Sequence, residues 1–153
     1  MSLDKDYLNQ FIRVTEFAAY GASPFIGKGN KNAADQGAVD KMRTQLNKID
    51  MMGTVVIGEG EMDEAPMLHI GEKVGTKKGI EIDIALDPLE GTKFTANNLP
   101  GAFSVLVVAE KGNLLSAPDT YMEKIVVGSN LPPNLLDLDN SVERNINLLA
   151  NAK

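Results

Sequence analysis

An alternating apolar segment that ends in two carboxylates constrains this chain more than any other feature. Ile80, Ile82, Ile84 and Leu86 recur at every second position, a period typical of a half-buried strand. The segment Asp87-Pro88-Leu89-Glu90-Gly91-Thr92 follows directly. Because proline gives no N–H to a sheet ladder, we expect the strand to end at this point. Two acids, a glycine and a hydroxyl then lie together at the tip of a strand.

The residue types in this segment suit a metal site beside a phosphate. Asp87 and Glu90 supply hard oxygen ligands of the kind that Mg²⁺ and Mn²⁺ prefer. Gly91 and Thr92 would begin a short helix over 91–98, whose first N–H groups can face a phosphate. The Thr92 hydroxyl can instead cap that helix. A plain Asp-Pro turn before a capped helix explains the same residues, so the pattern alone leaves both interpretations open.

A second acidic segment follows another apolar run. The run 54–57 predicts a buried strand, and Gly58-Glu59-Gly60-Glu61-Met62-Asp63-Glu64 places four carboxylates directly behind it. Glu59 can share or hold a second cation, since two metals together can stabilise the attacking and leaving oxygens of a phosphate ester. The spacing fails as an EF-hand, because Glu64 replaces the glycine at the sixth position and Ile70 replaces the final glutamate. A solvated acidic loop remains the competing interpretation.

Three further residues are ambiguous on spacing alone. Asp35, near the start of a predicted helix, suits either a metal ligand or an acid that stabilises the helix dipole, and spacing favours the latter. Tyr121 is by default the first aromatic of a strand. His69 is the only histidine, which excludes mechanisms that need two histidines.

Composition and charge narrow the class of protein. The chain has 153 residues, enough for one domain over 1–153 with a real core. A net charge of −6 argues against a nucleic-acid partner. No apolar run approaches the roughly 18 residues that span a bilayer, so we expect no membrane partner. The absence of cysteine excludes disulfides and thiolate zinc sites, and the first residues do not resemble a signal peptide, so we expect a cytoplasmic protein.

The remaining pattern predicts a layered α/β fold, with a mixed or antiparallel sheet flanked by helices. Strands are expected over 54–57, 80–86 and 104–109, the last of them buried, with a further candidate over 121–127. A hairpin turn is expected at 110–113. Helices are expected over 5–22, over about 33–49, and near the end of the chain, where Asn140 and Glu143 resemble a capping box.

Several long segments resemble class II fructose-1,6-bisphosphatases. The resemblance covers 55–68, 70–75 and 83–92, and extends to 13–16 and 117–124. The Asp-Pro-Leu-Glu-Gly-Thr element alone is similar to one shared by the wider lithium-sensitive phosphatase superfamily, including inositol monophosphatases. The Gly-Glu-Gly-Glu segment narrows the resemblance to class II.

The resemblance implies a sugar-phosphatase sandwich that hydrolyses the 1-phosphate of fructose 1,6-bisphosphate with Mg²⁺ or Mn²⁺, a step of gluconeogenesis. It implies that Asp35 and Glu59 are catalytic and bind one metal. By the same resemblance Asp87 and Glu90 bind another metal. The segment Glu90, Gly91 and Thr92 would meet the substrate phosphate, with Thr92 helping to activate the attacking water, and Tyr121 would contact the substrate. The family thus reverses the spacing-based interpretation of Asp35 and Tyr121.

The chain also departs from the family. Members are longer, and their second half supplies a further acidic metal ligand and the segments that hold the sugar bisphosphate. We therefore expect the N-terminal part of such an enzyme, its C-terminal domain absent, as a homo-oligomer or with a partner chain that supplies the C-terminal half. A sedoheptulose-1,7-bisphosphatase or dual enzyme is one alternative, and a non-catalytic metal- or phosphate-binding module is another. Asn30 stands where many relatives have an aspartate, which changes the local charge.

Overall fold

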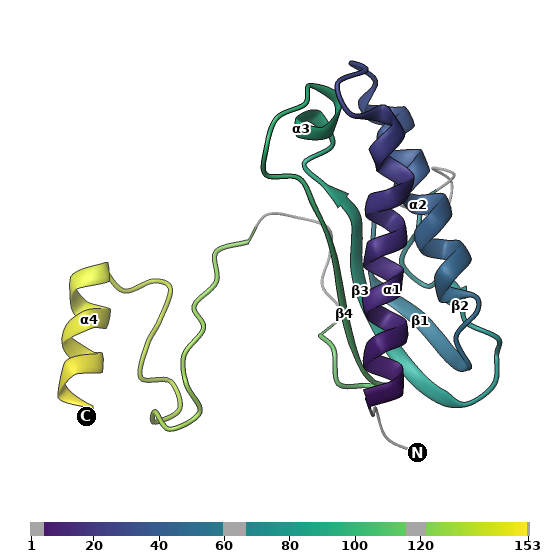
Figure 1. Ribbon diagram of the computed structural model, residues 1–153. Helices are drawn as coiled ribbons and strands as arrows, with labels where there is room; N and C mark the ends of the chain where they lie inside the picture. The colour runs from purple at the N-terminus through teal and green to yellow at the C-terminus, as the bar shows by residue number, and fades with distance from the viewer. Residues whose placement is uncertain (1–4, 60–66, 116–121, 153) are drawn as a thin grey trace. The chain divides into compact units, whose positions relative to one another are not determined.

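The computed structural model describes residues 5–59, 67–115 and 122–152, and the chain forms two compact units, 1–119 and 120–153. The expectation of one domain over 1–153 stays a prediction. The first unit combines a sheet with α-helices (Figure 1). Its elements are α1 (Lys5–Ala22), η1 (Ser23–Phe25), α2 (Lys31–Leu46), β1 (Met51–Ile57), β2 (Lys73–Val74), β3 (Ile80–Glu90), α3 (Thr92–Ala96) and β4 (Phe103–Glu110).

The sheet is mixed, as expected, with four described strands in the order β2-β1-β3-β4. Strands β1 and β3 are parallel, whereas β2 and β4 pair antiparallel to their neighbours. Helices α1 and α2 pack against each other and cover one face of the sheet (Figure 1). The result is a two-layer α/β unit whose core lies between this helix pair and the sheet.

Helix α1 matches its predicted bounds, and α2 begins earlier than predicted. The buried residues of α1 recur every three or four positions, at Tyr7, Phe11, Val14 and Ala18. Helix α2 begins at Lys31 because the Oδ1 atom of Asn30 accepts a hydrogen bond from the Ala33 N–H at 3.0 Å. It ends at Leu46, short of the predicted position 49.

Strand β3 is longer than the sequence predicts, which corrects the expectation that Asp-Pro ends it. The strand continues through Pro88 to Glu90. Its pairing with β1 stops at Ala85, and its register to β4 shifts between Asp87 and Glu90. Pro88 therefore lies at a bulge, where the ladder can do without its N–H.

Strand β4 was expected to be buried, and that expectation is wrong. Its side chains alternate between exposed and half-buried, because one face of the strand, with Leu106 and Val108, lies toward α1. Among the described residues, β4 is also an edge strand of the sheet. A turn is present at Lys111 and Gly112, but the described residues 113–115 form no strand, so the predicted hairpin is not there. The Gly112 N–H donates to Asp83 Oδ2 at 2.7 Å, which fixes the turn to β3.

The second unit has less regular structure over its described residues. Residues 122–127 form no strand, which contradicts the candidate strand there, and Tyr121 lies outside the described residues. Helix α4 (Val142–Asn151) is capped by Ser141, whose Oγ accepts from the Arg144 N–H at 3.2 Å. The predicted cap at Asn140 is therefore one residue early. No helix in the described part of the chain is long and apolar enough to cross a membrane.

Candidate metal centre

The carboxyl ends of β1 and β3 lie side by side at the same end of the sheet, because the two strands are neighbours and run parallel. Glu59 follows β1, and Asp87 and Glu90 lie at the end of β3. The loop before α2 is joined to α3 by hydrogen bonds from the Gly27 N–H to the Thr95 oxygen at 3.0 Å and from the Gly29 N–H to the Ala96 oxygen at 2.8 Å. The start of α2 therefore lies beside α3, at the end of β3 (Figure 1).

Asp87 is the centre of the acidic cluster. Its Oδ1 atom accepts a hydrogen bond from the Leu89 N–H at 2.9 Å, which fixes the side chain in the turn. Burial, then a hydrogen bond with Glu90, raise the pKa of Asp87 to about 6, against smaller opposing effects that include a hydrogen bond with Glu59. Three carboxyl groups thus meet at this point, and a bound cation would offset both their repulsion and their desolvation.

The backbone around Glu59 packs closely against the backbone of Leu68. Its N–H donates to the Leu68 oxygen at 3.2 Å. A Cβ atom on the preceding residue, Gly58, would lie 2.2 Å from the same oxygen, so only glycine fits there. The other acids of the segment, Glu61, Asp63 and Glu64, lie outside the described residues.

Asp35 lies in the second turn of α2 and is half-buried. Its Oδ1 atom is buried and has no hydrogen-bond partner among the described residues, and burial raises its pKa. The first turn of α2 contains no acid, and the helix dipole acts mainly on that turn. The interpretation of Asp35 as a dipole-stabilising acid, which spacing favoured, therefore does not fit. A buried carboxylate oxygen without a protein partner fits a metal ligand better than a dipole-stabilising acid.

The donor set fits a hard cation, although it does not close around one point. Asp35, Glu59, Asp87 and Glu90 offer only carboxylate oxygens, the ligands that Mg²⁺ and Mn²⁺ take together with water. Within the described residues, no three acid or histidine side chains are grouped tightly enough to hold a metal by themselves. Asp87 interacts with Glu90 and Glu59, whereas burial alone shifts the pKa of Asp35. The structure thus brings together three of the four expected ligands and places Asp35 on a separate element.

Gly91 and Thr92 take up the expected helix start. Gly91 is the N-cap of α3, with a φ of +87° that favours glycine. Thr92 is the first helical residue and is half-buried. The alternative in which Thr92 occupies the capping position is therefore wrong.

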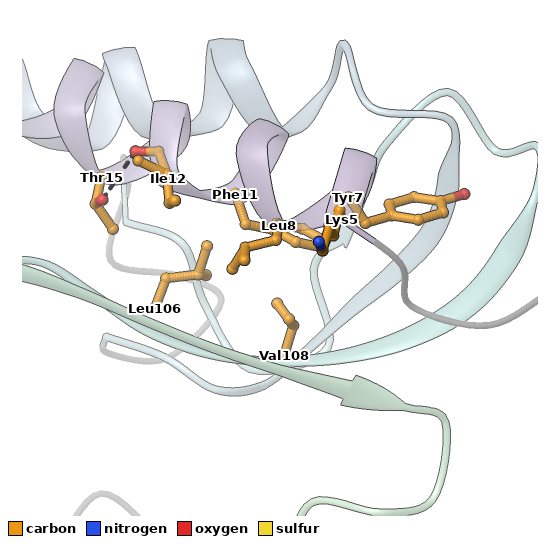
Figure 2. A pocket seen from close by; sticks show the side chains of 8 residues that line it. All are labelled: Lys5, Tyr7, Leu8, Phe11, Ile12, Thr15, Leu106 and Val108. Carbon is orange, nitrogen blue, oxygen red and sulfur yellow. Dashed lines mark hydrogen bonds between the residues drawn. The ribbon is translucent and has the colours of Figure 1, made fainter.

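A cavity of about 690 Å³ lies elsewhere, between α1 and β4 (Figure 2). Leu8 and Ile12 point into it from α1, opposite Leu106 and Val108 of β4 (Figure 2). Among the described residues, no acid lines it. The cavity is an apolar hollow and takes no part in the acidic cluster.

One contact that supports the site had no signal in the sequence. Arg43 of α2 binds Glu72, with its Nε atom 2.7 Å from Glu72 Oε1, across 29 positions of sequence. His69 joins the pair, with its Nδ1 atom 3.3 Å from Glu72 Oε2. Nothing local in the sequence joins Arg43 to Glu72, whereas His69 and Glu72 are only three positions apart.

An α/β layer with acids gathered at the carboxyl ends of parallel strands is an arrangement that suits proteins binding hard cations, the ions that assist phosphate chemistry. Over residues 5–153 the chain matches the family described as bacterial fructose-1,6-bisphosphatase, glpX-encoded. The chain belongs to this family, which is one of metal-dependent phosphatases.

Individual relatives agree with the family match. The chain is 56% identical over 119 residues to fructose-1,6-bisphosphatase 1 class 2 of Escherichia coli, covering 78% of this chain and 35% of the relative. It is 51% identical over 141 residues to fructose-1,6-bisphosphatase class 2 of Haemophilus influenzae, covering 92% and 42%. It is 46% identical over 156 residues to D-fructose 1,6-bisphosphatase class 2/sedoheptulose 1,7-bisphosphatase of Thermosynechococcus vestitus, covering 92% and 44%. The chain thus spans less than half the length of these relatives.

Proposed function

We propose that the protein hydrolyses fructose 1,6-bisphosphate to fructose 6-phosphate, as a step of gluconeogenesis in the cytoplasm. In this reaction a water oxygen bonds to the phosphorus of the 1-phosphate, and the bond between phosphorus and the C1 oxygen breaks. A proton from the water ends on the C1 oxygen, and inorganic phosphate leaves. The observation that carries the proposal is the meeting of Glu59, Asp87 and Glu90 at the ends of parallel strands, in a chain of this family.

Four carboxylates are the proposed metal ligands. Asp35 and Glu59 would hold one Mg²⁺ or Mn²⁺, and Asp87 and Glu90 would hold another. Such ions, when bound, stabilise the attacking and leaving oxygens of phosphate transfer. The unpartnered Oδ1 of Asp35 and the raised pKa of Asp87 support this assignment, because both side chains are half-buried and no cation among the described residues lowers the pKa of either.

The residues after β3 would bind the substrate and orient the water. The segment Glu90, Gly91 and Thr92 would meet the 1-phosphate at the start of α3. The Thr92 hydroxyl would accept a hydrogen bond from the attacking water and orient its oxygen toward phosphorus. Tyr121 would contact the sugar bisphosphate.

Two alternatives keep specific support. The name of the Thermosynechococcus vestitus relative includes sedoheptulose 1,7-bisphosphatase, so we also consider this substrate. A non-catalytic module that binds metal or phosphate is the second alternative, because the chain spans 35 to 44% of the relatives described above. Action as a homo-oligomer, or with a partner chain that supplies the C-terminal half, is part of the proposal.

Phosphate release from each bisphosphate, measured with Mn²⁺ and with Mg²⁺, tests the proposal. Turnover of fructose 1,6-bisphosphate that is lost on Asp87→Asn is the expected result. Asp40→Asn, at an exposed acid of α2, is the matched control and should leave turnover unchanged. Metal binding by calorimetry without turnover would favour the module, and faster release from sedoheptulose 1,7-bisphosphate would favour the other enzyme.

A further inference from the structure

The Arg43 side chain, on helix α2, makes three hydrogen bonds to the segment 67–72. Its Nε atom lies 2.7 Å from Glu72 Oε1, and its Nη2 atom lies 3.1 Å from Glu72 Oε2. The same Nη2 donates to the Met67 carbonyl oxygen at 2.6 Å. The side chains of Arg43 and Glu72 are 27% and 15% exposed, so solvent screens the pair only in part. Arg43 therefore fixes both ends of the segment 67–72 to α2.

That segment is in turn bonded to the end of β1. The Val55 N–H donates to the Glu72 oxygen at 3.0 Å, and the Gly71 N–H donates to the Val55 oxygen at 2.7 Å. The Glu59 N–H donates to the Leu68 oxygen at 3.2 Å. Gly58 lets the two backbones approach this closely, so the position of Leu68 helps to set the position of Glu59.

Arg43 also shares a helix with Asp35. The two residues are eight positions apart on α2, which is about two turns. A rigid helix thus joins Asp35 to Arg43, and Arg43 joins the helix to the segment that holds Glu59.

We propose that Arg43 is a positioning residue that sets the separation of Asp35 and Glu59, so that the two carboxylates can share one cation. This inference rests on the proposed function, in which both are ligands of the same metal. Glu72 accepts hydrogen bonds from both Nε and Nη2 of Arg43, and we call this paired contact the Arg43 clamp. The clamp requires arginine. A lysine has no planar fork, and its single ammonium nitrogen cannot reproduce the paired contacts to both carboxylate oxygens.

Arg43→Lys tests the inference with two readouts. Amide exchange of Glu59, whose N–H bonds to Leu68, should become at least about tenfold faster if the clamp holds this backbone. The affinity for Mn²⁺, measured by calorimetry, should fall about tenfold or more, as when an outer partner of a metal ligand is lost. In an Asp35→Asn background, the remaining Mn²⁺ affinity should no longer respond to Arg43→Lys.

Arg13→Lys is the matched control, because Arg13 pairs with Glu16 at 2.8 Å on the exposed face of α1. It should leave both readouts unchanged. Unchanged Glu59 exchange in Arg43→Lys overturns the inference, as does unchanged Mn²⁺ affinity in a protein that binds Mn²⁺. A wild-type protein that binds no Mn²⁺ overturns the proposed function instead, and Glu59 exchange still decides whether Arg43 positions that residue.

Discussion

At the scale of single residues, the ionised Asp87 carboxylate lowers the stability of the metal-free fold. Burial and Glu90 raise its pKa from 3.8 to about 6. The folded protein therefore holds this proton more tightly than the unfolded chain does. An asparagine in place of Asp87 would keep an oxygen for the Leu89 N–H and would remove the charge, so a variant can separate the structural role of the side chain from its charge.

Asp87→Asn should raise the melting temperature of the metal-free protein at pH 7.5 and abolish stabilisation by Mn²⁺. Solvent screens this half-exposed site, so the ionised carboxylate destabilises the fold by about 1 kcal/mol. Its removal should raise the melting temperature by about 2 to 4 °C. Differential scanning fluorimetry with and without Mn²⁺ measures both effects, with Asp40→Asn as the control. A variant that melts at or below the wild-type temperature without metal would contradict this account of Asp87.

The same stabilisation should depend on pH with a definite sign. A carboxyl group whose folded pKa is raised favours the fold below its unfolded pKa and loses that contribution as pH rises through the folded value. The difference in melting temperature between Asp87→Asn and the wild type should therefore be near zero at pH 4 and grow up to about pH 6. A difference that is constant over this range in metal-free buffer would show that charge is not the cause.

The sequence predicted the acids of the candidate site better than their surroundings. The pattern of neighbouring residues placed Asp87 and Glu90 together near the carboxyl end of a strand, although both lie within β3 and not after it. Spacing misjudged Asp35, because its position relative to the helix start depends on the cap at Asn30. The contact between Arg43 and Glu72 could not be predicted from sequence spacing, because the two residues are 29 positions apart and meet only in the folded chain.

At the scale of elements, the packing of α1 against α2 depends on two glycines. A Cβ on Gly21 would lie 2.0 Å from the Gly37 oxygen, and a Cβ on Gly37 would lie 2.4 Å from the Gly21 oxygen. Both contacts are with backbone, which no side-chain rotation can relieve. The close crossing of the two helices is therefore built into the sequence at these positions.

Gly21→Ala should destabilise the protein, although helix propensity alone predicts a gain of up to about 1 kcal/mol. We expect a net loss of about 2 kcal/mol, because the helices must move apart. Urea denaturation followed by circular dichroism measures it. Gly128→Ala, where an added Cβ meets nothing within 4 Å, is the control. A Gly21→Ala variant at least as stable as wild type would show that the crossing is looser than described.

Elements with a strong local period were predicted well, and those that depend on neighbours were not. Helix α1 has its predicted bounds because one apolar face defines it. The end of β3 was misplaced, because the bulge at Pro88 depends on how β4 pairs. Strand β4 was judged buried from its apolar composition, but α1 covers the face with Leu106 and Val108, and Val105 and Val107 on the opposite face are exposed.

At the scale of the whole molecule, the first unit exposes an apolar strand at the edge of its described sheet. Strand β4 pairs with β3 on one side, and the described residues place no strand on its other side. On this strand Phe103, Val105 and Val107 are 57%, 38% and 49% exposed. An apolar strand with free backbone groups is a template for pairing with another chain.

We therefore expect the protein to self-associate through β4 as its concentration rises. Static light scattering over a concentration series should show a mass above that of the monomer, and Val107→Lys should lower it, because a charge on an edge strand opposes pairing. Met52→Lys is the matched control, since Met52 is 41% exposed but lies on the central strand β1. Equal effects of the two substitutions would indicate association through the sheet face, and a monomer at every concentration would contradict the prediction.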